Sequence, residues 1–127
     1  MQSVLLVAVG GAIGAASRHI LSGIILSRTI NAHFPFPTFT VNVLGCLAAG
    51  LLLAMNERFE ILHGPLRIFL FTGILGGFTT FSAFGVETVS LIKRDLLGTA
   101  ALYSLGSVAA GVVALYGALF VFGPSSK

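Results

Sequence analysis

The sequence predicts an all-α membrane protein with four transmembrane helices, the third of them broken at mid-membrane. Only 9% of the 127 residues are charged and 56% are hydrophobic, with a mean hydropathy of +1.02. A soluble domain carries about a quarter charged residues, so lipid must surround most of this chain. The apolar residues form four long runs, and glycine and hydroxyl residues interrupt the third.

Each run approaches or exceeds the ~20 residues that a helix needs to cross the hydrocarbon core. Polar segments separate the runs, so we expect one transmembrane domain over residues 1–127. Four spans place both chain ends on one side of the membrane. The first run lacks the basic start and cleavage site of a signal peptide, which predicts a retained span. The expected spans are about 4–26, 39–55, 66–92 and 96–122.

The first two spans carry isolated polar residues. Arg18 interrupts the first, and Thr38 behind Pro37 is expected to cap the second. Asn42 lies inside the second span, where its amide can bond a neighbouring helix or solvate an anion. The single cysteine, Cys46, excludes an intrachain disulfide and is expected to be a buried small hydrophobe.

The third span holds the most informative stretch. Gly76 and Gly77 each weaken a helix by roughly 1 kcal/mol relative to alanine. Thr79, Thr80 and Ser82 follow, and their hydroxyls can bond the backbone in place of the helical ladder. Backbone freed at mid-membrane is tolerated only inside protein or beside an ion or substrate site. The alternative is a continuous kinked helix whose hydroxyls bond preceding carbonyls.

Phe78, Phe81 and Phe84 recur every three residues beyond the glycines, which places them on one helix face. Their ring edges carry partial positive charge and could line a path for a small anion. The alternative is a stripe of ordinary core or lipid-facing packing.

Small residues recur at four-residue spacing in every span. In lipid, such residues let helix backbones approach closely. They indicate either packing within one chain or a dimer interface. The pairs are Gly10 with Gly14, Gly45 with Ala49, Gly73 with Gly77, and Ser107 with Gly111.

Lysine and arginine are balanced between the two ends of the spans, and their distribution sets the orientation of membrane proteins. Three lysine or arginine residues flank each side of the membrane. Counting Arg18, which lies inside the first span, would change the balance to four against three. Either so small a count carries no information, or copies insert both ways and two opposed copies form a dimer. The two groups are Arg58, Arg67 and Lys127 against Arg28, Lys93 and Arg94.

The run Gly-Gly-Phe-Thr-Thr-Phe-Ser-Ala-Phe at 76–84 resembles the Gly-Gly-Leu-Thr-Thr-Phe-Ser-Thr-Phe-Ser signature of the Fluc/CrcB fluoride channels. The stretch from Gly10 to Arg18 is similar to the first-span pattern of that family. The stretch from Thr38 to Asn42, with Gly45, is similar to its second-span pattern. The resemblance covers nearly the whole chain in order.

The resemblance implies a fluoride-selective channel that allows passive efflux and protects a microbial cell, in whose inner membrane it lies, from fluoride. It implies a dual-topology antiparallel homodimer with two pores. It also implies a structural sodium ion at the dimer centre, held by backbone carbonyls of Gly76 and Thr79 from each subunit.

The resemblance assigns roles to individual residues as well. Asn42, Phe81 and Phe84 match pore residues of the family, Ser82 matches a hydroxyl of its motif, and Tyr103 and Ser107 are candidates for the fourth-span lining. Arg18 resembles a vestibule arginine, although it could equally snorkel to the interface. Glu87 lies in or near the membrane and is a functional candidate on that ground. The chain departs from the motif at Phe78, Ala83 and Gly85.

Two other functions compete. A small dual-topology transporter would need a carboxylate in its first span, which has none. A non-transporting assembly subunit would leave the polar break without purpose. Glu87, Asp95 and the histidines are scattered, without a nucleophile–base pair or a metal-ligand spacing, so an enzyme is not expected.

Overall fold

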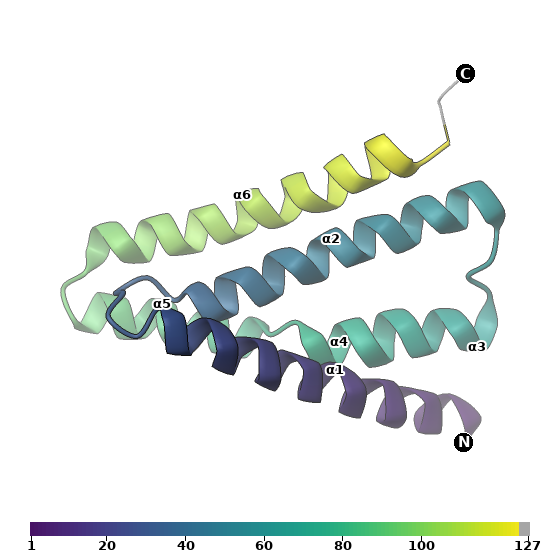
Figure 1. Cartoon of the computed structure of the whole chain (residues 1–127), viewed down its shortest axis with the longest axis horizontal. Helices are drawn as coiled ribbons and strands as arrows, with labels where there is room; N and C mark the ends of the chain where they lie inside the picture. Colours follow the sequence, from purple (N-terminus) through teal and green to yellow (C-terminus); the bar gives the residue numbers. More distant parts are fainter. Residues whose placement is uncertain (125–127) are drawn as a thin grey trace.

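The computed structural model describes residues 1–124 and is built of helices joined by short connectors (Figure 1). Four helical segments are long and apolar enough to cross a membrane, which confirms the predicted fold class. The third segment is bent and consists of four consecutive elements. The bounds are α1 Gln2–Arg28, α2 Phe36–Phe59, α3 Gly64–Arg67, η1 Ile68–Leu75, α4 Gly76–Phe78, α5 Phe81–Lys93 and α6 Leu97–Phe122.

The four segments run side by side as an elongated bundle. Helix α2 packs along α6, whereas α1 packs along η1 and α4. Figure 1 shows that α1 begins and α6 ends at the same end of the bundle, as an even number of spans requires. Lys127, one of the charges counted for that end, lies outside the described residues. The polar connectors lie at the two ends of the bundle, where headgroups and water would meet them.

Helix α2 begins earlier than expected, and the predicted cap at Thr38 is wrong. Pro35 occupies the capping position, and Pro37 lies in the first turn. Proline is tolerated there because the first helical N–H groups have no intrahelical acceptor. Thr38 therefore lies inside the helix, where it is buried and free to bond another segment.

The break in the third span is present, but it is displaced from the predicted position. Both Gly76 and Gly77 are helical, and Gly76 has φ −62° and ψ −36°. The chain leaves the helix at Thr79 (φ −83°, ψ 157°) and Thr80 (φ −148°, ψ 114°). The intrinsic cost of glycine is small, and α4 packs on α1, so the two glycines remain helical.

The hydroxyl residues form the break as predicted. Thr80 caps α5 by accepting a hydrogen bond from the Ala83 N–H at 3.2 Å, and Thr79 donates its hydroxyl to the Leu75 carbonyl at 2.9 Å. The extended pair falls about halfway along the 30-residue third segment. The continuous kinked helix, the alternative from sequence, is therefore wrong.

Small residues bring α1 and the third span into backbone contact. A Cβ added to Gly10 would lie 2.9 Å from the Gly73 Cα, and one added to Gly14 would collide with the Ile74 carbonyl. Gly45 of α2 leaves the space that the Thr79 side chain occupies. These positions serve packing within one chain, one of the two interpretations that the sequence left open.

Candidate functional site

Asn42 holds the extended backbone of the break. Its side-chain nitrogen donates to the Thr80 carbonyl at 3.1 Å, and its side-chain oxygen accepts from the Thr80 N–H at 2.9 Å. One amide thus replaces both backbone partners that Thr80 would have in a continuous helix. Such groups are costly to leave unpaired in a membrane, so Asn42 stabilises the break.

Arg18 reaches the same break from α1. Its Nε–H donates to the Gly77 carbonyl at 3.1 Å, and the side chain is half-buried. This hydrogen bond directs the guanidinium toward the break and not toward the end of α1. The vestibule role taken from the resemblance stays a prediction.

Two further carbonyls at the break lose their helical donors. In a continuous helix the Thr80 N–H would bond the Gly76 oxygen, and the Ala83 N–H would bond the Thr79 oxygen. Here these N–H groups bond Asn42 and the Thr80 hydroxyl instead. Within residues 1–124 no three His, Cys, Asp or Glu side chains gather to hold a metal ion. Unwound backbone carbonyls are ligands that coordinate sodium at broken membrane helices.

A cavity of about 270 Å³ lies beside the break and brings together most of the predicted pore residues. Asn42, Phe81, Phe84 and Ser107 all line it, although they come from three helices. The Phe81 and Phe84 rings lie 5.7 Å apart, centroid to centroid, with an interplanar angle of 33°. The full lining is Asn42, Cys46, Thr79, Thr80, Phe81, Phe84, Ser107 and Val108.

Ser107 and Cys46 also line the cavity. The Ser107 hydroxyl oxygen is buried and has no hydrogen-bond partner within the described residues. Buried hydroxyls are almost always bonded, so an unpaired one in a cavity wall is suited to a ligand. Cys46 was expected to be a buried hydrophobe; it is half-buried, and its sulfur lies next to Gly111 and the cavity.

The remaining candidates lie outside this cavity. Ser82 is exposed and lies 3.4 Å from the Thr80 hydroxyl. Phe78 precedes the break, so the expectation that it shares one helix face with Phe81 and Phe84 is wrong. Tyr103 is fully buried, and its ring packs on Phe84 at 5.3 Å.

Glu87 forms a polar cluster that the sequence did not reveal. One carboxylate oxygen accepts the Thr38 hydroxyl at 2.7 Å, and the other accepts the Tyr103 hydroxyl at 2.6 Å. Since Phe84 touches Tyr103, this cluster adjoins the phenylalanine pair of the cavity. The three residues come from α2, α5 and α6, so Thr38 could be recognised only from the fold.

Comparison with known proteins agrees with this geometry. Residues 5–119 match the family described as CrcB-like protein, camphor resistance (CrcB). The chain belongs to the CrcB family. Its relatives include the fluoride-specific ion channel FluC of Methylobacillus flagellatus, 47% identical with 91% of each chain covered. FluC 2 of Nitrobacter hamburgensis is 45% identical, covering 91% of this chain and 92% of its own, and FluC of Agrobacterium fabrum is 40% identical over 94% of each.

Membership of the CrcB family confirms the resemblance read from the sequence, including the expectation of a protein that is not an enzyme. Together with the four apolar helices it establishes a multi-pass membrane protein. The roles of individual residues stay predictions.

Proposed function

We propose that this chain is a fluoride-selective channel through which fluoride leaves the cell down its electrochemical gradient. The observation that carries the proposal is the cavity in which Asn42, Phe81, Phe84 and Ser107 meet beside a broken membrane helix. The CrcB relatives are named fluoride-specific ion channels, and we take fluoride as the conducted ion from these names.

The cavity offers the chemistry that a small, strongly hydrated anion needs. Losing hydration is costly unless other donors replace the water. Ser107 has a free hydroxyl, and Asn42 has a second amide hydrogen besides the one bound to Thr80. The ring edges of Phe81 and Phe84 add partial positive charge. Several weak sites in series allow an ion both to enter and to leave.

The proposal includes an antiparallel, dual-topology homodimer. Phe81, a cavity residue, is 84% exposed on the single chain, and Gly76 at the break is also exposed. A second copy would cover both. The balanced lysine and arginine count supports copies that insert in opposite directions.

A structural sodium ion between the two copies belongs to the same proposal. The Gly76 and Thr79 carbonyls, freed of their helical donors, would hold it in each subunit. When bound, the ion neutralises the partial negative charge of carbonyls that no water reaches. The chain itself exposes these oxygens by diverting the Thr80 and Ala83 amides.

We place the channel in the inner membrane of a microbial cell, where efflux would protect against fluoride. The rival antiporter is disfavoured because the carboxylate nearest the cavity, Glu87, lies on α5 and is bound by two hydroxyls. An assembly subunit is disfavoured by the unpaired Ser107 hydroxyl in the cavity wall.

Fluoride release from proteoliposomes, read with a fluoride-selective electrode, tests the proposal. We expect rapid release of fluoride without release of chloride. Phe81→Ile and Phe84→Ile should each lower the fluoride rate at least tenfold, because an aliphatic side chain has no positive edge. Phe120→Ile is the matched control, since Phe120 on α6 is 80% exposed and does not line the cavity.

Equal release of fluoride and chloride would reject fluoride selectivity. Unchanged fluoride rates in both cavity variants would reject the role of the ring edges.

A further inference from the structure

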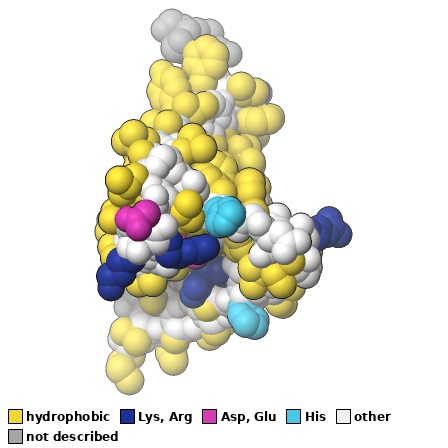
Figure 2. Space-filling view, turned by 90° about the vertical axis from the view of Figure 1, so that its left-hand side faces the viewer, with side chains coloured by type: hydrophobic (Ala, Val, Ile, Leu, Met, Phe, Trp, Pro, Cys, Tyr) yellow, Lys and Arg dark blue, Asp and Glu magenta, His cyan; other side chains and the backbone are white. Residues whose placement is uncertain are grey.

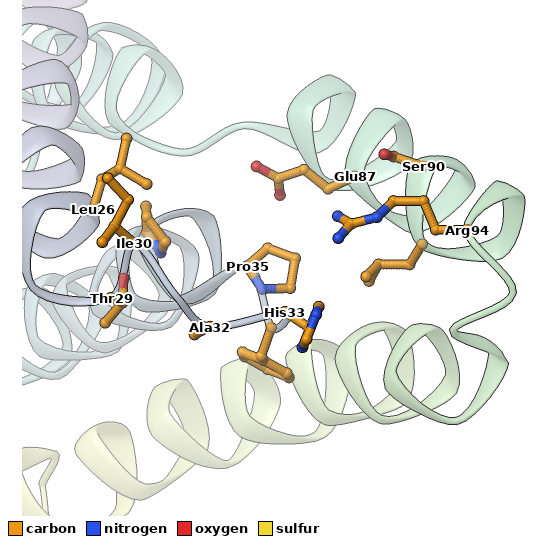
Figure 3. A pocket seen from close by; sticks show the side chains of 12 residues that line it. Leu26, Thr29, Ile30, Ala32, His33, Pro35, Glu87, Ser90 and Arg94 are labelled. Atoms are coloured by element: carbon orange, nitrogen blue, oxygen red, sulfur yellow. The ribbon is translucent and has the colours of Figure 1, made fainter.

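A second pocket lies at the end of the bundle where α5 turns into α6. It has a volume of about 220 Å³ and is separate in its lining from the phenylalanine cavity. Figure 3 shows the last turns of α1, the connector to α2 and the face of α5 around it. Its polar lining residues are Thr29, His33, Glu87, Ser90 and Arg94. Nothing in the proposed conduction of fluoride uses His33, Ser90 or Arg94.

Arg94 is the arginine among the residues that line this pocket. Glu87, Ser90 and Arg94 share one face of the helical stretch, and the Arg94 side chain extends into the space between α5 and the connector (Figure 3). Figure 3 shows its guanidinium on the side of the pocket that also holds Glu87. Arginine presents five N–H donors in a planar fork that matches the oxygens of phosphate.

The surrounding surface strengthens the positive potential. Arg28 ends α1 and Lys93 ends α5 at this same end of the bundle. Figure 2 looks onto this end and shows lysine and arginine side chains beside histidine, with an acidic side chain among them. His33 lines the pocket opposite α5 and can donate an imidazole N–H to an anion.

Glu87 does not close the pocket to an anion. Both of its oxygens already accept hydroxyl hydrogen bonds, from Thr38 and Tyr103. An anion between Arg94 and His33 would meet N–H donors from both side chains of the lining.

The pocket also lies at the depth of lipid headgroups. Helix α1 ends at Arg28, α2 begins at Phe36, α5 ends at Lys93 and α6 begins at Leu97, so all four spans meet the membrane–water boundary here. The other lining residues include apolar Leu26, Ile30 and Phe34 beside the polar groups. A volume of 220 Å³ corresponds to about seven water molecules at ~30 Å³ each, which is far more than a single halide needs.

We propose that this pocket binds a phosphate group through Arg94 and His33, supplied either by an anionic phospholipid headgroup or by free phosphate. A cationic pocket between membrane helices at headgroup depth is a recurrent lipid-binding arrangement. The apolar walls beside Arg94 offer contact for the glycerol and upper acyl carbons of a lipid.

Native mass spectrometry of the purified protein in detergent tests this proposal. Three probes are titrated: phosphatidylglycerol, phosphatidylcholine and inorganic phosphate. We expect phosphatidylglycerol to bind at one site per chain, more tightly than phosphatidylcholine. Arg94→Gln should weaken this binding at least tenfold, because it removes a charge-assisted pair.

Lys93→Gln is the matched control, since it removes the same charge from the adjacent position, which does not line the pocket. It should leave the affinity for phosphatidylglycerol nearly unchanged. Arg94-dependent binding of inorganic phosphate alone would assign the pocket to free phosphate. Binding of no phosphate probe, or equal loss in Arg94→Gln and Lys93→Gln, would overturn the proposal. Neither substituted residue lines the phenylalanine cavity. Fluoride release measured in parallel therefore shows whether the phosphate-site proposal fails while the fluoride-channel proposal holds.

Discussion

Asn42 shows how much one side chain determines in this protein. The family resemblance makes it a pore residue, and it does line the cavity. Yet both ends of its amide are also engaged by Thr80, whose backbone it holds in an extended conformation. A ligand at Asn42 therefore contacts a group whose orientation is already fixed, which reduces the cost of organising the site on binding.

Asn42→Asp tests whether Asn42 stabilises the extended backbone at Thr80, independently of any contact with the ion. As a carboxylate, aspartate keeps an acceptor for the Thr80 N–H, but it loses the donor for the Thr80 carbonyl and places a negative charge beside that oxygen. An unpaired buried carbonyl costs about 1–3 kcal/mol, so the thermal midpoint of the purified protein should fall. Light scattering during a temperature ramp in detergent measures this midpoint.

Asn56→Asp is the natural control for that measurement. The Asn56 side-chain oxygen accepts from the Leu62 N–H at 2.9 Å, and aspartate preserves this bond. Its midpoint should stay close to that of the original protein. Equal midpoints for Asn42→Asp and Asn56→Asp would show that the Thr80 carbonyl does not need its amide partner.

At the scale of elements, the third span shows what sequence reasoning reaches. Four spans, the existence of the break and its hydroxyl residues were all predictable, because composition and local bonding preferences determine them. The position of the break was not predictable, since Gly76 and Gly77 remain helical where α4 packs on α1. Glycine propensity is worth about 1 kcal/mol, which tertiary packing readily exceeds.

The candidate site was predictable to a similar degree. Asn42, Phe81, Phe84 and Ser107 line one cavity, whereas Ser82 and Tyr103, which were predicted with them, do not line it, and their pore roles stay predictions. The bond between Thr38 and Glu87 was not predictable, because it joins residues 49 positions apart that share no local pattern. Only the packing of three helices brings such groups together.

The broken element also predicts a dependence on cation. If sodium occupies the carbonyls of Gly76 and Thr79, replacing it with N-methylglucamine at constant chloride should lower the thermal midpoint of the purified protein. A ligand present at a hundred times its Kd stabilises the folded state by about 2.7 kcal/mol, so a shift of several degrees is expected. Identical midpoints in the two salts, measured by the same light-scattering ramp, would remove sodium from the proposal.

At the scale of the whole molecule, the balance of charge between the two ends is the property to perturb. Arg58→Ala with Arg67→Ala removes positive charge from one end, so the other end should become uniformly cytoplasmic. If function needs two opposed copies, this variant alone should release little fluoride in cells that express it.

Co-expression provides the decisive comparison. A second variant, Arg28→Ala with Lys93→Ala, should insert in the opposite direction, and the two together should restore fluoride release. Both proteins must be detected in the membrane at similar levels for the comparison to count. Full activity of either variant alone would contradict the need for opposed copies.

The partners of the broken span have a further consequence for biosynthesis. Arg18 and Asn42, which bind the backbone at Gly77 and Thr80, both precede the third span in the chain. During synthesis they have left the ribosome before the interrupted segment emerges. When the third span inserts, the hydrogen-bond partners of its interrupted backbone are therefore already in the membrane. Without them, the segment would enter lipid with unpaired peptide groups.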